Sequence, residues 1–252
     1  MSKKIKISGI IFLLFVSALI LWMSFAIEEN NVNKIKSVKI KGNYYLTQND
    51  YLNFAFLNNK NRLKNLTLNI ICDRLLKHPY IKTVDAKYSG NGVVEVELKE
   101  KKFEAFIINK DQMFLLTDNI CLIPNISNLK YSDLPIITNI SAGKELKRFA
   151  ILKNNVQIKK SLRIIMAMKL LSREFYSDLS EIDFSNGQNI LLRFSSKDYP
   201  VVIGENDEVT RVVYLYKLWN SLKDKKHNDF IDYIDLRYSK KIYIGITEGI
   251  ES

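Results

Sequence analysis

Residues 75–100 read LLKHPYIKTVDAKYSGNGVVEVELKE and decide the fold of the first part of the chain. The His78-Pro79 pair ends the helix that precedes it, because a residue before proline is disfavoured in helical conformation. Two strands then flank the turn SGNG, one from Tyr80 to Tyr88 and one from Val93 to Lys99. The second strand alternates valine and leucine with glutamate and lysine, which is typical of a strand with one buried face. The stretch therefore predicts a helix that leads into a β-hairpin.

A strand and another helix are predicted before this segment. Ile35 to Lys41 alternates apolar residues with lysines and predicts a strand. Thr47 is expected to be the N-cap of a helix, with Asp50 in the capping-box position, and the polar segment Asn58 to Asn65 predicts a loop. The helix from about Thr67 to Lys77 has one apolar face, formed by Leu68, Ile71, Cys72 and Leu75. The order of elements over residues 35–101 is thus β-α-α-β-β.

From residue 102 onward the pattern is mostly β. Strands are predicted at Phe103–Asn109, Gln112–Leu116, Cys121–Ile123, Leu134–Ile137, Leu179–Phe184, Ile190–Phe194, Val201–Ile203, Tyr233–Tyr238 and Ile242–Thr247. Two amphipathic helices are predicted at Gln157–Phe175 and at about Asp207–Leu222, the second burying Val209, Val212, Val213, Tyr216 and Trp219. The sequence predicts an α+β fold, with a small βααββ domain at 35–101 and a mostly antiparallel β domain with two helices at 102–252.

The first 34 residues predict a membrane anchor. The run from Ile7 to Ile27 has no charged residue and makes a helix about 30 Å long, the thickness of a bilayer's hydrocarbon core. Three lysines within residues 1–6 place that end in the cytoplasm, and Trp22 lies where an interfacial anchor is expected. A signal peptide cleaved at residues 24–26 (SFA) is the alternative, although the apolar run is long for one. We expect residues 28–34 to be a linker and the rest to face outward.

Composition indicates an ordered chain with a basic surface. With 47% hydrophobic and 26% charged residues, the chain can form a core, which excludes wholesale disorder. The part after the apolar run carries 35 basic and 27 acidic side chains, a net charge of +8 that favours anionic neighbours. Basic clusters at 59–64, 159–163 and 223–226 have no interleaved aromatic residues, so solvated surfaces, some near anionic lipid, are favoured over nucleic-acid binding.

Little in the sequence supports catalysis. The two histidines are His78, expected to cap helix carbonyls, and His227, expected in a solvated loop. Common hydrolase, metalloprotease and nucleotide-binding motifs are missing, and Glu95 and Glu97 lie on the solvent face of their strand. Cys72 and Cys121 fall in different predicted domains, which favours buried thiols over a disulfide. We therefore expect no catalytic, cofactor or metal site and no small-molecule substrate.

The ordered set of motifs resembles the FtsQ (DivIB) family of bacterial cell-division proteins. VKIKGN (38–43), LLKHPYIKTV (75–84) and NGVVEVELKEK (91–101) resemble a POTRA module. Further segments follow in the family's order: LTDN (116–119), LP (134–135), VVIG (201–204) and YIDLRY (233–238). The segment EKKFEA (100–105) departs from the family because it lacks the usual proline. The resemblance spans nearly the whole chain.

This resemblance implies a non-enzymatic divisome scaffold in the inner membrane at the division septum. Its outer β domain is expected to recruit FtsB and FtsL, to contact other divisome proteins, and to couple septal wall synthesis to the division ring. A POTRA-type chaperone or transport component for outer-membrane proteins is the alternative; it is disfavoured by the single POTRA module and the helical anchor. A membrane-tethered wall hydrolase is disfavoured because no acid/base pair is evident.

The partner site is expected on the last edge of the sheet, since an exposed edge can accept a partner's strand. The expected contacts are Tyr233, Ile234, Asp235, Leu236, Arg237, Tyr238, Ile242, Tyr243, Ile244 and Ile246. The resemblance implies Arg237 and Tyr238 in particular. Alternatively, Arg237 pairs with Asp235 inside the chain and Tyr238 belongs to the core. Trp219 is expected to be a core residue rather than a contact.

Overall fold

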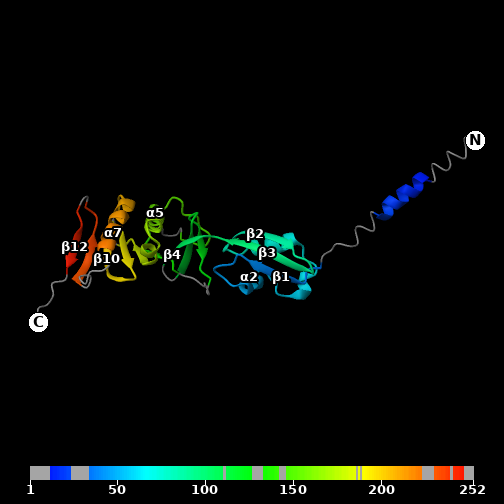
Figure 1. Cartoon of the computed structure of the whole chain (residues 1–252). Helices are drawn as coiled ribbons and strands as arrows, with labels where there is room; N and C mark the ends of the chain where they lie inside the picture. The colour runs from blue at the N-terminus through cyan, green and yellow to red at the C-terminus, as the bar shows by residue number, and fades with distance from the viewer. Residues whose placement is uncertain are drawn as a thin grey trace, which may run out of the picture.

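The structure, a computed structural model, describes residues 12–23, 34–109, 112–126, 133–141, 146–185, 187, 189–222, 230–238 and 241–246. Figure 1 shows a small unit that contains β1 to β3, followed by a larger unit that ends at β12. The predicted linker, the basic run at 223–226 and His227 fall outside the described residues, apart from residue 34.

Residues 12–23 form a helix whose large apolar side chains are exposed, Trp22 among them. Within the described part of the chain, no helix combines the length and hydropathy that a membrane crossing requires. Ile7 and Ile27, the predicted ends of the span, lie outside that part. The membrane span stays a prediction.

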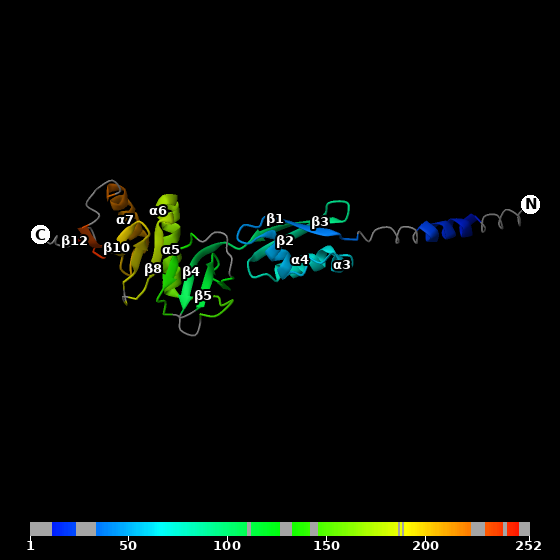
Figure 2. The ribbon, with the colours of Figure 1, turned by 90° about the horizontal axis from the view of Figure 1, so that it is seen from below.

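The small unit is a three-stranded sheet with helices on one face. Its elements in chain order are β1 (Ser37–Lys41), α2 (Gln48–Phe54), α3 (Lys60–Leu63), α4 (Leu68–Leu76), β2 (Ile81–Tyr88) and β3 (Val93–Glu100). The central strand β3 pairs in parallel with β1 and antiparallel with β2. Figure 2 shows α3 and α4 on one side of this sheet.

The predicted packing face of α4 is confirmed. Ile71 and Leu75 are fully buried in one cluster with Val94 and Val96 of β3. The predicted capping box is also present, because the Thr47 and Asp50 side chains each accept a hydrogen bond from the other residue's backbone N–H. Alternating burial along the strands thus places the helices as the sequence pattern predicts.

Two predictions about this unit are wrong. The polar segment predicted as a loop contains α3, a single turn that begins because the Asn59 side chain accepts the Asn61 N–H at 3.0 Å. His78 does not cap carbonyls, since its Nδ1 accepts the Tyr80 N–H at 3.2 Å. Burial and the nearby Lys101 charge lower the pKa of His78 to about 4, which keeps the ring neutral.

The large unit is built on one continuous sheet. Its elements in chain order are β4 (Phe103–Asn109), β5 (Gln112–Thr117), β6 (Leu122–Pro124), β7 (Ile136–Thr138), α5 (Val156–Leu171), α6 (Arg173–Ser177), β8 (Leu179–Asp183), β9 (Leu191–Phe194), β10 (Lys197–Val202), α7 (Glu208–Leu222), β11 (Ile231–Asp235) and β12 (Tyr243–Ile246). The strand order is β12-β11-β10-β9-β8-β7-β4-β5-β6. Among the described strands, five of the eight neighbouring pairs are antiparallel, and β4 with β7, β7 with β8, and β10 with β11 are parallel.

The helices of this unit differ from the prediction. The single helix expected at 157–175 is divided at Ser172, whose extended backbone ends α5 and whose hydroxyl caps α6. α7 buries Val212 and Leu215, whereas Val209 is exposed, so its apolar stripe is rotated from the predicted one. Trp219 packs against Phe175 and Phe194 and is partly buried, as expected for a residue at the edge of the core.

The two units share a hydrophobic cluster. One face of β4 and β5 packs against α5 and the rest of the large unit's core, whereas Phe103, Phe106 and Leu115 on the other face belong to the small unit's core. The Phe103 ring lies 4.9 Å from the Tyr80 ring. The Ile126 N–H donates to the Tyr80 hydroxyl at 2.8 Å. This end of the sheet is therefore covered on both faces.

Candidate partner-binding edge

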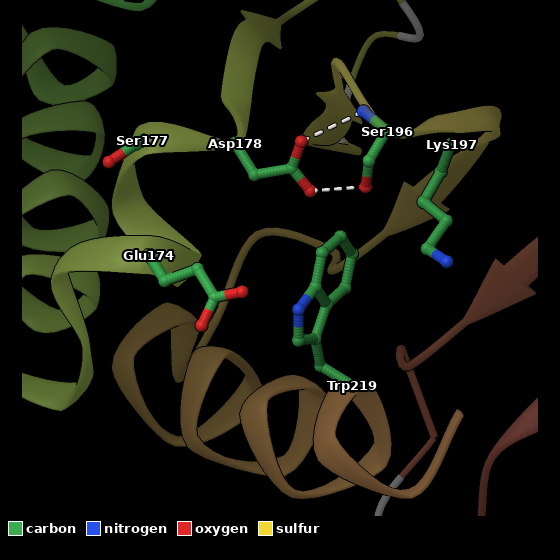
Figure 3. A pocket seen from close by; sticks show the side chains of 6 residues that line it. All are labelled: Glu174, Ser177, Asp178, Ser196, Lys197 and Trp219. Carbon is green, nitrogen blue, oxygen red and sulfur yellow. Dashed lines mark hydrogen bonds between the residues drawn. The ribbon is translucent and has the colours of Figure 1, made fainter. Parts of the chain in front are cut away.

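A hollow of about 420 Å³ lies between α6, α7 and the β9–β10 turn, and Figure 3 shows its lining. Both Asp178 carboxylate oxygens accept hydrogen bonds from Ser196, one from the backbone N–H at 2.8 Å and one from the hydroxyl at 2.6 Å. The Lys197 ammonium lies 5.3 Å from the centre of the Trp219 ring. These contacts hold the turn against α6 and α7. The polar side chains of the hollow thus serve the packing of the fold, and they do not indicate a ligand site.

Potential metal ligands are not clustered in the part of the chain that the structure describes. Among the described residues, no group of three or more histidine, cysteine, aspartate or glutamate side chains is placed to hold a metal ion. Cys72 and Cys121 are both free thiols. The strongest candidate for function is instead a surface at the end of the large sheet.

β12 is the outermost strand at one end of that sheet. It pairs antiparallel with β11, and β11 in turn pairs in parallel with β10. Of the two strands predicted to form the edge, only β12 therefore lies there. β11 also begins and ends earlier than predicted, which places Leu236, Arg237 and Tyr238 after the strand.

The predicted contact residues fall into two groups by exposure. Seven are exposed: Arg237 and, with exposed fractions of 39–66%, Tyr233, Tyr238, Ile242, Tyr243, Ile244 and Ile246. Ile234, Asp235 and Leu236 are buried. Ile234 and Leu236 pack into the core, and the Asp235 carboxylate is paired with Arg237. Buried side chains do not reach a partner, so these three residues are removed from the candidate contacts.

The face of β12 that continues the helix-covered side of the sheet is apolar. Ile244 lies opposite Ile234, which shares a buried cluster with Val212 and Leu215 of α7. Ile246 lies opposite Ile231 on the same strand pair. Both isoleucines of β12 thus extend the core side of the sheet beyond the cover that α7 provides.

The other face carries tyrosines. Tyr233 lies opposite Gly245, and its ring occupies the space where a side chain at 245 would begin, with ring carbons 2.3–2.9 Å from an added Cβ. The Tyr243 and Tyr238 rings meet edge to face at 5.0 Å. Aromatic residues with a polar tip are typical anchors of protein interfaces.

The Arg237 guanidinium pairs with a carboxylate of this chain rather than with one of a partner. Its Nε and Nη2 donate to the Asp235 carboxylate at 2.6–3.0 Å, and its backbone N–H donates to Oδ1 at 2.9 Å. Burial alone would raise the pKa of Asp235, but these hydrogen bonds and the Arg237 charge hold it below its ordinary value. The alternative in which Arg237 pairs with Asp235 is supported. Tyr238, by contrast, is exposed rather than part of the core.

Arg211 of α7 completes this corner and was not predicted. It donates to the backbone carbonyl of Tyr238 at 2.8 Å and of Arg237 at 3.1 Å. These bonds fix the chain where it leaves β11, and so they fix the position of the Tyr238 ring. No sequence pattern connects a helix arginine to carbonyls 26 and 27 residues away, so sequence reasoning had no signal for it.

The chain is similar to known proteins of one family. Residues 105–237 match the family described as cell division protein FtsQ/DivIB, C-terminal, which is 133 of 252 residues. The chain belongs to the FtsQ/DivIB family. The match runs from β4 to the end of the Asp235–Arg237 pair, and β12 lies beyond it.

Proteins named FtsQ or DivIB are similar to this chain over a longer region than the family match. FtsQ of Geotalea daltonii is 22% identical over 220 residues, which cover 87% of this chain and 75% of that protein. DivIB of Clostridium tetani is 21% identical over 214 residues, covering 84% and 76%. The extracytoplasmic domain of DivIB from Geobacillus stearothermophilus overlays with a TM-score of 0.31 at 13% identity, covering 51% of this chain and 99% of that domain.

Proposed function

We propose that this protein is a non-enzymatic divisome scaffold, anchored in the inner membrane at the septum, whose β12 edge binds FtsB together with FtsL. Membership of the FtsQ/DivIB family supports a role in cell division. The uncharged run at 7–27 and the lysines before it support an outward-facing topology. The single observation that carries the partner site is the apolar, exposed edge strand β12.

The edge itself suits a partner strand. An edge strand presents unpaired backbone N–H and C=O groups, which a second chain can satisfy by adding a strand. Proteins usually protect such edges with charged residues or proline. Residues 243–246 read YIGI and contain neither. The sequence of β12 is therefore that of an edge made to be covered.

A helix of the partner fits beside the strand. Ile244 and Ile246 lie on the face that α7 covers further along the sheet, so a partner helix packed next to α7 would bury them. Complete burial of an isoleucine side chain contributes about 1.5–3 kcal/mol. We therefore infer that FtsB contributes both a strand and an adjacent helix, and that FtsL binds through FtsB.

The binding test uses residues 34–252, because both hydrophobic cores lie between Ile35 and Leu236 and this fragment contains every residue in them. Ile244→Asp and Ile246→Asp together should weaken capture of the FtsB–FtsL pair at least about tenfold, which corresponds to about 1.4 kcal/mol. The control is Leu170→Asp on α5, an apolar side chain more exposed than either isoleucine, which should bind as the wild type does. Unchanged capture by the folded β12 variant would place the interface elsewhere.

A second pair of variants separates contact from support. Tyr238→Ala should weaken capture while leaving the melting temperature unchanged, because the ring is exposed. Arg237→Glu should lower the melting temperature, because Asp235 then loses its charged partner. If Arg237→Glu melts as the wild type and loses binding, Arg237 is itself a contact.

Topology has its own test. Alkaline phosphatase fused after Ser252 should be active, since the enzyme folds only outside the cytoplasm. A mature N-terminus found near Ile27 would show cleavage and contradict the anchor.

Depletion of the protein should give filamentous cells, as expected when septation fails.

A further inference from the structure

A second hollow, of about 620 Å³, lies on the helical face of the small unit, far from β12. It is formed by the end of α2, the turn after it, α3 and α4, and its lining residues are Asn53, Phe54, Ala55, Phe56, Arg62, Arg74 and Lys77. The proposed FtsB site does not involve any of them.

The turn that forms one wall has an unusual residue in it. The Phe56 N–H donates to the Asn53 carbonyl at 3.1 Å and the Leu57 N–H to the Leu52 carbonyl at 2.8 Å, which is the pattern of a Schellman motif. The residue at this position has a left-handed backbone and is usually glycine. Here it is Phe56, with φ +56°.

The Phe56 ring receives no core packing in return for this strain. The side chain is 68% exposed, and Phe54 beside it is also exposed. A bulky residue in the left-handed region is unfavourable and persists where the surrounding structure or a function requires it. Two aromatic rings at the rim of a hollow point to an apolar contact made by the small unit.

Positive charge is concentrated at the same place. Arg62, Arg74 and Lys77 line the hollow, and no carboxylate is among the lining residues. Asp73, the neighbour of Arg74, is not among the lining residues; burial first, and then the charges of Asp85 and Asp73, raise the pKa of Cys72. The side chains that line the hollow therefore carry only positive charge, although Asp73 lies one helical turn before Lys77 outside the lining.

The opposite face of the small unit is different. There, basic side chains alternate with acidic ones, and Lys41 forms an ion pair with Glu95 at 3.0 Å. The Lys41 hydrogen bond and charge, with further contributions from Lys87 and Lys39, lower the pKa of Glu95. Charge on this sheet face is mixed, whereas the residues that line the hollow on the helical face include three cations and no carboxylate.

We propose that this hollow docks the small unit on the anionic phospholipid surface of the membrane. The aromatic rings would lie at the level of the headgroups, and the two arginines and the lysine would contact phosphates, which guanidinium groups bind through paired hydrogen bonds. The choice of lipid rests on the proposed anchor: the seven residues at 28–34 span at most about 25 Å, which keeps the unit near the bilayer.

The test uses fragment 34–252, which lacks the apolar run, so that a membrane span cannot supply the binding. Phosphatidylcholine vesicles with phosphatidylglycerol should sediment the fragment, pure phosphatidylcholine vesicles should not, and salt should weaken the binding. Arg62→Glu with Arg74→Glu should weaken binding at least about tenfold. The matched control is Lys39→Glu with Lys87→Glu, which changes the net charge by the same amount on the other face. This control should bind the vesicles much more tightly than the Arg62→Glu, Arg74→Glu variant does.

Phe56→Gly separates docking from folding. Glycine suits the left-handed position, so the variant should melt at the same or a higher temperature while vesicle binding falls several-fold. A purely structural Phe56 would give the higher melting temperature with unchanged binding.

Three results would overturn the proposal: equal loss of binding in the two charge variants, equal binding to neutral vesicles, or unchanged binding by Phe56→Gly. If the fragment ignores anionic vesicles but binds polyglutamate through the same arginines, the occupant is an acidic protein segment and the proposal also fails. The phosphatase fusion tests the anchor separately.

Discussion

The two ends of the nine-stranded sheet differ in what covers them. At the β6 end, one face packs on the large unit's helices and the other on the small unit, and the outer side of β6 bonds to residues 149–151. The Leu122 N–H donates to the Ala150 carbonyl at 2.9 Å, and the Leu122 carbonyl accepts from the Phe149 N–H at 2.7 Å. At the β12 end, the described residues provide no such cover. One end of the sheet is thus buried, and the other is open at β12, where we propose that the partner binds.

The largest expected contrast is between apolar residues at the two ends. Leu115→Ala at the β6 end should cost about 2–5 kcal/mol, because Leu115 is fully buried between the units. Ile246→Ala at the β12 end should change stability by less than about 0.5 kcal/mol, since its side chain is 66% exposed. Urea unfolding of fragment 34–252 measures both. Similar losses would mean that β12 is covered within the chain.

The next contrast is in the response to acid, between the small unit, which contains His78, and the β12 end of the large sheet. His78 has a pKa of about 4 when folded and about 6.5 when unfolded, so the unfolded chain binds the proton first and stability falls as pH drops from 6.5 to 4. The full loss is about 3 kcal/mol. Amide exchange should show β2 and α4 opening before β11. His78→Gln should remove this pH dependence, and a variant that keeps it would assign the effect to another group.

These contrasts show what sequence patterns can and cannot predict. Alternation and helical spacing predicted the small unit's strands and the buried face of α4, because those signals are local. α3 was missed since one side-chain cap on Asn59 is enough to start a single turn in a polar segment. The long helix was not divided because Ser172 interrupts no apolar pattern.

For the candidate site, the structure bears only on which residues are exposed, and the sequence predicted that in part. The tyrosines and isoleucines near residues 233–246 were expected to be exposed, and six of them are. That Ile234 and Leu236 are buried depends on β11 lying between β10 and β12, and strand order is not encoded in the periodicity of any one strand. The Asp235–Arg237 pair was only an alternative, because the sequence could not say whether the arginine faces a carboxylate or solvent.

A smaller effect tests the corner that supports the β12 end. Arg237→Ala should cost about 1–3 kcal/mol at neutral pH, because the buried Asp235 carboxylate loses its charged hydrogen bonds. The folded pKa of Asp235 is depressed, so this contribution is present above its unfolded pKa of about 3.9 and is lost as pH falls below it. Chemical unfolding at neutral and acidic pH should therefore show the difference from wild type shrinking in acid. A difference independent of pH would contradict the pairing.

The smallest effect concerns Gly245. A methyl group there meets the Tyr233 ring, a flexible side chain that can move aside, so Gly245→Ala should cost no more than about 1 kcal/mol. Combining it with Tyr233→Ala should remove most of that cost, as read from melting temperatures. A cost that survives the double substitution would mean that the backbone, rather than the ring, requires glycine.

The cluster shared by the two units also has a mechanical meaning. Bending at the junction would separate Phe103 from Tyr80 and expose both rings to water. The free energy of that exposure opposes rotation of one unit against the other. A pull applied at β12 would pass along the nine-stranded sheet to β4 and, through the shared cluster, to the small unit and its separate sheet. With the proposed partner on β12 and the proposed anchor at the N-terminus, the chain would carry tension from one to the other.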